Sequence, residues 1–144
     1  MSVKQISVFL ENRPGALQAM TAVLAENDID MRAFSLAEAS DFGIARIIVD
    51  DVYKTTTVLK DANFVHSVTT VLGVALSDTP GGLDAILRVL SEAGVNVEYM
   101  YAFLGGKKGK DAYMIFRVAD EAKASAALTA KGIKQVSPEE LSGI

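Results

Sequence analysis

The stretch LENRPGAL at residues 10–17 recurs as LSDTPGGL at residues 76–83. Each copy follows a short run that alternates in hydrophobicity like a strand, and each precedes a segment with helical spacing. The match continues without a gap on both sides, from Val8 and Val74 to Glu26 and Glu92. A repeat of this kind predicts two equivalent supersecondary units.

Composition limits the classes of partner. The chain has 144 residues, 50% of them hydrophobic, with a formal net charge of −4 and no cysteine. This composition predicts a packed core, while the acidic balance disfavours nucleic acid, whose phosphates need clustered Lys and Arg. Apolar runs are too short for a bilayer, and the N-terminal residues lack a signal-peptide pattern. We therefore expect a cytoplasmic protein with no nucleic-acid and no membrane partner.

Hydrophobic periodicity predicts the order strand, helix, strand, strand, helix, strand in both halves. In the first half these segments are Val3–Leu10, Gly15–Asn27, Ile29–Glu38, Phe42–Val49, a helix from Asp50 to Asp61, and Phe64–Thr70. In the second half they are Val71–Leu76, Gly81–Ala93, Val95–Leu104, Ala112–Val118, Asp120–Lys131 and Ile133–Val136. The main difference is a longer connection over residues 105–111, which we expect to be a mobile hairpin.

These elements predict an α+β fold of two ferredoxin-like βαββαβ units, over residues 1–70 and 71–144. Each unit would place two helices on one face of a four-stranded antiparallel sheet. A unit of about seventy residues buries little surface alone, so we expect the two units to pack side by side. Apolar side chains such as Phe9 on the outer sheet face favour a further homodimer.

The chemistry of the repeated turn suits a free amino acid. Glycine at positions 15 and 81 lets the backbone approach a ligand, and amides at a helix start can face a carboxylate. The ammonium would need oxygen acceptors, for which the candidates are Asn12, Asp78, Asp30 and Asn96. Apolar neighbours such as Leu17, Ile29, Met31 or Val97 would set specificity.

A strand, then (Asn/Asp)-x-Pro-Gly-x-Leu, then a helix within a βαββαβ unit resembles the ACT domain, a small-molecule-sensing module of amino-acid metabolism. The resemblance covers the whole chain as two tandem units without a catalytic domain. It implies a ligand site where the turn of one unit meets the second strand of a neighbouring unit. Carried over to this sequence, the site residues are Asn12, Arg13, Pro14, Gly15, Ala16, Leu17, Asp30, Met31, Asp78, Thr79, Pro80, Gly81, Gly82, Leu83, Asn96 and Val97.

Within this resemblance the two turns differ. Asn12 matches the residue that the family often uses to hold a bound amino acid, whereas Asp78 is a variant that changes the local charge. A purely structural explanation also stays open, in which Asn12 or Asp78 caps the helix and the Pro-Gly pair only shapes the turn. The single histidine, His66, has no second His or Cys to form a metal site, and no cofactor is implied.

The leading hypothesis is a regulatory protein without catalytic activity, which binds a small amino acid or related acid between the two ACT units and acts through its dimer or on an enzyme or regulator. The alternative is a non-catalytic interaction subunit of a metabolic enzyme, with vestigial ligand sites. A small enzyme such as an acyl-phosphatase would need Arg13 and Asn12 as its pair, and the sequence offers no Ser/His/Asp set, no Cys and no matched carboxylate pair. RNA binding by the sheet is disfavoured by the acidic charge.

Overall fold

The computed structural model describes residues 2–103 and 111–143, which form two compact units. The first unit is Lys4–Thr69, and the second comprises the described residues from Thr70 onward together with Ser2 and Val3. Apart from Asp111, the hairpin expected at residues 105–111 lies outside the described residues.

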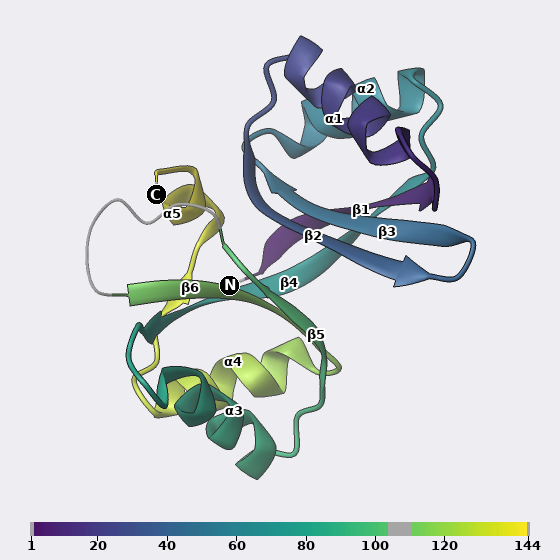
Figure 1. The fold of residues 1–144 in the computed structure, drawn as a ribbon. Helices are drawn as coiled ribbons and strands as arrows, with labels where there is room; N and C mark the ends of the chain where they lie inside the picture. Colours follow the sequence, from purple (N-terminus) through teal and green to yellow (C-terminus); the bar gives the residue numbers. More distant parts are fainter. Residues whose placement is uncertain (1, 104–110, 144) are drawn as a thin grey trace. The chain divides into compact units, whose positions relative to one another are not determined.

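The first unit is an antiparallel sheet with two helices on one face (Figure 1). Its sheet order is β2-β3-β1-β4. The strands are β1 (Val3–Glu11), β2 (Met31–Ala39), β3 (Phe42–Val49) and the start of β4 (His66–Ser77), and the helices are α1 (Ala16–Glu26) and α2 (Val52–Asp61). This is the order of elements that the sequence predicts.

The second unit repeats the arrangement, with sheet order β7-β4-β6-β5. It contains the end of β4, α3 (Gly82–Glu92), β5 (Val97–Ala102), β6 (Asp111–Val118), α4 (Glu121–Ala130), β7 (Gln135–Val136) and α5 (Pro138–Gly143). Helices α3 and α4 cover one face of this sheet, and α5 lies on its other side (Figure 1).

Two features differ from the sequence prediction. The expected separate strands Phe64–Thr70 and Val71–Leu76 are wrong, because β4 is one continuous strand over His66–Ser77 with neither a proline nor a left-handed residue to end it. Helix α5 was not expected. It begins with a capping box, in which the Glu140 amide donates to Ser137 Oγ over 3.2 Å and the Ser137 amide donates to Glu140 Oε2 over 3.4 Å.

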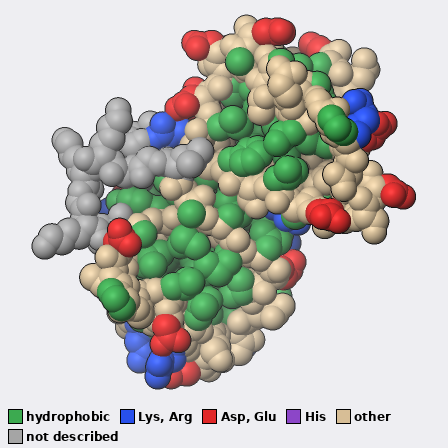
Figure 2. All heavy atoms as spheres, in the orientation of Figure 1, with side chains coloured by type: hydrophobic (Ala, Val, Ile, Leu, Met, Phe, Trp, Pro, Cys, Tyr) green, Lys and Arg blue, Asp and Glu red, His purple; other side chains and the backbone are tan. Residues whose placement is uncertain are grey.

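Each unit has its own core between helices and sheet. In the first unit, Ile6, Val8 and Ile47 from the sheet pack with Met20 and Leu24 of α1. The second core consists of Leu72, Val74, Phe116, Val118 and Val95 with Ile86, Leu90, Ala124 and Leu128 from the helices. On the face shown in Figure 2, hydrophobic side chains gather between the helices and the sheet of each unit.

Equivalent residues of the two sequence repeats form equivalent hydrogen bonds. The Phe9 amide donates to Val65 O over 2.9 Å, and the Ala75 amide donates to Lys134 O over 3.0 Å at the equivalent point of the second unit. Helix α2 begins at the N-cap Asp51, whose Oδ1 accepts from the Lys54 amide over 2.9 Å. Asp120 caps α4 in the same way, accepting from the Lys123 amide over 3.0 Å.

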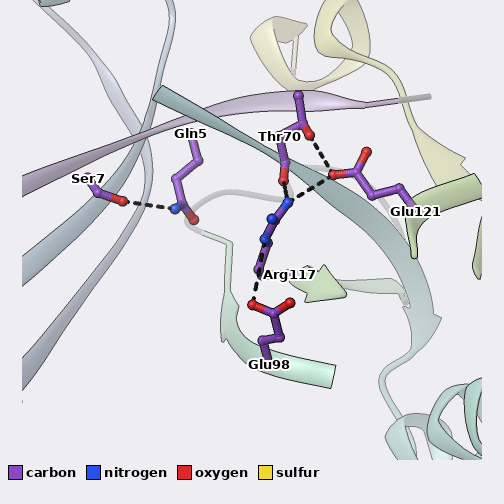
Figure 3. A network of polar contacts seen from close by, with 6 residues as sticks. All are labelled: Gln5, Ser7, Thr70, Glu98, Arg117 and Glu121. Atoms are coloured by element: carbon purple, nitrogen blue, oxygen red, sulfur yellow. Dashed lines mark hydrogen bonds and ion pairs between the residues drawn. The ribbon is translucent and has the colours of Figure 1, made fainter. Parts of the chain in front are cut away.

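A polar network surrounds Arg117 in the second unit (Figure 3). Arg117 Nη1 donates to Thr70 O over 2.9 Å and lies 3.4 Å from Glu121 Oε1. Glu121 also accepts from Thr70 Oγ1 over 2.6 Å and from Ser2 Oγ over 2.7 Å. It therefore ties Ser2 and Thr70 to the start of α4.

Asp51→Ala tests the N-cap of α2. The substitution leaves the Lys54 amide without its acceptor, so we expect the free energy of unfolding to fall by about 1 kcal/mol in urea titrations. Asp61→Ala, at the other end of the same helix, is the matched control. A carboxylate near a helix C-terminus is unfavourable, so Asp61→Ala is expected to leave stability unchanged or raised. Equal losses of unfolding free energy for both variants would contradict the assignment of Asp51 as the N-cap of α2.

Candidate functional site

The first turn joins β1 to α1 through left-handed backbone at Gly15, where φ is 86°. Gly81 repeats this conformation before α3, again with φ of 86°. Both glycines are the N-cap residues, and neither helix receives a side-chain cap. The explanation of Asn12 and Asp78 as helix caps is therefore wrong, because the glycine turn places a different residue at the cap position.

Asn12 instead contacts the tip of the β2–β3 hairpin. Its Nδ2 donates to Ser40 O over 3.0 Å, and its backbone amide donates to Asp41 O over 3.0 Å. With Nδ2 on this carbonyl, Oδ1 makes no hydrogen bond to any residue that the structure describes. The side chain thus fixes the hairpin and keeps an acceptor for a ligand.

The start of α1 leaves backbone donors unpaired. The Ala16 amide is used within the turn, donating to Arg13 O over 3.3 Å, and the Ala19 amide donates to Gly15 O over 2.9 Å. The amides of Gly15, Leu17 and Gln18 have no hydrogen-bond partner among the described residues. Such orphan donors at a helix start favour anionic groups.

A cavity of about 250 Å³ lies between this turn and the β2–β3 hairpin. It is lined by Leu10, Glu11, Asn12, Arg13, Leu17, Leu36, Ala37, Glu38 and Gly43. Of the site residues predicted from sequence, Asn12, Arg13 and Leu17 line it, while Pro14, Gly15 and Ala16 shape the turn without lining it. The hairpin residues were missed.

The cavity is open because a side chain is absent from the helix-covered face of the sheet. Gly43 of β3 pairs with Leu10 of β1 and with Glu38 of β2. Strand alternation places these three residues on the face that carries Val8 and Leu36. Only the position in the middle strand has no side chain, so Gly43 forms a low floor between its neighbours.

Charged groups line the cavity together with the leucines. Arg13 Nε and Glu11 Oε2 form an ion pair at 2.5 Å, with both side chains mostly exposed. Glu38 adds a second carboxylate from the hairpin. An exposed pair contributes little to stability, but one guanidinium and two carboxylates beside an apolar floor match the two charges of a zwitterion.

The predicted strand-start residues lie elsewhere in each unit. Met31 pairs with Val49 at one end of β3, whereas the turn adjoins the other end of that strand at Gly43. Asp30 is held at this far end, where its amide donates to Asp50 Oδ1 over 3.1 Å and its carboxylate accepts from Arg32 over 2.9 Å. The first unit therefore does not bring Asp30 or Met31 to its own turn.

The second unit shows the same separation. Val97 pairs with Val118, and Asn96 O accepts from the Ala119 amide over 3.1 Å, so both residues lie at the end of the sheet away from Gly81.

The second turn has a different surface. A Cβ on Gly82 would lie 2.1 Å from Ser77 O, so the backbone here is closer than any side chain permits. A cavity of about 310 Å³ near this turn lies beside the α4–β7 loop, and is lined by Ala75, Leu76, Ser77, Gly82, Ala85, Ile86, Gly132, Ile133 and Lys134. Of the predicted residues only Gly82 lines it; Asp78, Thr79, Pro80, Gly81 and Leu83 do not.

Among the described residues there is no group of three or more His, Cys, Asp or Glu side chains arranged for a metal ion. No helix in the described part of the chain is both long and apolar enough to cross a membrane.

The fold and its paired turns identify the class of protein. A family model for the ACT domain pair matches residues 1–144, and the chain belongs to this family. A search of curated proteins gave no significant match.

Solved structures agree with this assignment. A crystal structure of a protein from Bacteroides thetaiotaomicron is 36% identical, with a TM-score of 0.91 and coverage of 100% of this chain and 98% of that chain. The ligand-free regulatory subunit of aspartate kinase from Thermus thermophilus is 15% identical, with a TM-score of 0.65 over 90% of each chain. Its counterpart from Thermus flavus is 17% identical, with a TM-score of 0.62 over 88% of each chain. The two Thermus proteins share the fold.

Gly82→Ala and Gly81→Ala together test the close approach in the second turn. Gly81→Ala adds only the strain of a left-handed alanine, since nothing lies within 4 Å of its Cβ, and should cost about 1 kcal/mol of unfolding free energy. Gly82→Ala must displace the Ser77 carbonyl and should cost at least about 2 kcal/mol more. Urea unfolding of both variants measures the difference, and equal costs would contradict the described turn.

Proposed function

We propose that this ACT domain pair is a non-catalytic regulatory protein that binds a small amino acid or related acid at its first turn. The observation that carries the proposal is the cavity lined by Asn12, whose Oδ1 has no hydrogen-bond partner among the described residues, and by Leu17, in the first turn of a helix whose first amides are unpaired. A zwitterion needs this combination of donors and acceptors. The proposed location is cytoplasmic, and no cofactor is required.

Ligand binding would be coupled to conformation through the hairpin. Asn12 is part of the cavity wall and also holds the hairpin tip by two hydrogen bonds. A ligand on this side chain would therefore favour one arrangement of the hairpin over others. The position of the ligand between the two ACT units stays a prediction from the sequence. In that arrangement Asp30, Met31, Asn96 and Val97 would face the turns. The domain boundary at residue 70 also stays a prediction.

One contact supports a non-catalytic role. An acyl-phosphatase would use Arg13 and Asn12 as its pair, but Asn12 Nδ2 is already bonded to Ser40 O at the hairpin tip.

The alternative is an interaction subunit whose ligand sites are vestigial. The second turn favours it for that half of the chain, because Asp78 and Thr79 do not line the adjacent cavity. The Thermus proteins that share the fold are named as regulatory subunits of aspartate kinase. Under this alternative, the chain would act as a subunit of an enzyme.

A thermal-shift screen with the twenty amino acids tests the proposed function. We expect one compound or a small related group to raise the melting temperature by several degrees. Asn12→Ala should abolish this shift while lowering the stability of the free protein by about 1 kcal/mol or less, because an exposed hydrogen bond is lost. Asp78→Ala, in the equivalent position of the second turn, is the control and should keep the shift. Absence of a shift for every compound would contradict amino-acid binding.

We also propose that the protein is a homodimer. Phe9 is 40% exposed and Phe42 is 44% exposed on the first unit's sheet. Sedimentation of the wild-type protein is expected to give a dimer, and Phe9→Thr with Phe42→Thr is expected to shift it towards monomer. Tyr53→Thr alters a side chain on α2 that is 83% exposed and should leave the dimer intact. A wild-type monomer at tens of micromolar concentration would overturn the proposal.

A further inference from the structure

We infer that the hollow over Gly43 in the first unit receives the side chain of a branched aliphatic amino acid. The inference rests on the proposed amino-acid binding and adds the class of ligand and the residue that selects it.

The two units differ at this floor. Leu10 pairs with Gly43 in the first unit, and Leu76 pairs with Ala112 at the equivalent position of the second. One row further along the sheet, Val8 pairs with Ala45, whereas Val74 pairs with Met114. The middle strand therefore carries glycine and alanine in the first unit where it carries alanine and methionine in the second. Among the described residues, the first unit therefore has the lower floor beneath its turn.

The walls of the cavity fit an aliphatic side chain. Leu10, Leu17 and Leu36 line it, and the volume of about 250 Å³ is of amino-acid size and smaller than a typical drug-sized site. Leu36 is 51% exposed, so a ligand would cover apolar surface that water now contacts. Each buried methylene is worth about a fourfold gain in affinity. This predicts leucine, isoleucine or valine over alanine.

The charged residues orient such a ligand. Arg13 is already paired with Glu11 on the turn side, and its guanidinium has further N–H groups for a carboxylate. Glu38 lines the cavity from the hairpin side and forms no ion pair with any residue that the structure describes. The ammonium of the ligand would face Glu38, and its carboxylate would face Arg13.

Gly43→Ala and Gly43→Val test the floor directly. A Cβ at Gly43 would lie 3.4 Å from Leu36 Cδ1 and 3.5 Å from Ala37 O, and its backbone is not left-handed, so both variants should fold. Calorimetric titration with L-leucine, L-isoleucine, L-valine and L-alanine should show the branched amino acids binding more tightly to the wild type. Gly43→Val should weaken their binding about tenfold or more, and Gly43→Ala by a smaller factor.

Ala112→Val is the matched control, since it places the same valine side chain at the equivalent position of the second unit. Its affinity for the three branched amino acids should equal that of the wild type. If they bind Gly43→Val as tightly as the wild type, or if Ala112→Val weakens them equally, the inferred site is wrong while amino-acid binding stands. If the wild type binds only amino acids outside this class, the ligand class is wrong. If it binds none of the twenty, the proposed function fails together with this inference.

Glu38→Gln tests the orientation without changing the shape of the cavity. Its affinity for L-leucine should fall about tenfold, because a charge-assisted hydrogen bond is replaced by a neutral one. The probe 4-methylpentanoate has the side chain and carboxylate of leucine but no ammonium, so Glu38→Gln should not weaken its binding. Equal weakening of both compounds would overturn the assignment of Glu38.

Discussion

The left-handed backbone at Gly15 and Gly81 determines how each first strand continues into its first helix. Both residues have φ of 86°, a conformation that only glycine adopts without strain. The turn lets α1 and α3 begin directly behind the strand end and pack on the same face of the sheet. It also leaves amide groups at the helix start without partners. The left-handed glycine therefore determines both how the helix packs on the sheet and where unpaired backbone donors lie.

From this shared turn the two units have diverged by the side chains placed around it. The first unit carries Asn12, which bonds to the hairpin tip, and Gly43, which leaves a hollow under it. The second unit carries Gly82, whose backbone contacts Ser77 O too closely for a Cβ. Small differences in side-chain volume on a common scaffold thus give the described surfaces around the two turns different shapes.

The sequence predicts the fold well because its signals are local. The repeated Pro-Gly turn and the alternation of Val8 and Leu10 need no knowledge of distant residues, and Asp51 and Asp120 are caps with a clear position. The continuous β4 was missed because nothing in residues 64–76 distinguishes two strands that meet from one that continues. Helix α5 carried a readable signal, the Ser-Pro-Glu-Glu capping box at its start.

The candidate site was predicted only in part. Asn12, Arg13 and Leu17 follow from the motif, but the hairpin wall depends on strand register, which a single sequence does not fix. Glycine in a strand often marks a close approach or an open space. Gly43 is such a signal, and its meaning becomes clear only once Leu10 and Glu38 are known to flank it.

A crystal structure of the protein grown with saturating L-leucine tests the account most directly. The account predicts a leucine in the first unit, with its side chain over Gly43 between Leu17 and Leu36 and with Asn12 still bonded to Ser40. Leucine bound beside Gly81 with the Gly43 hollow empty would contradict it.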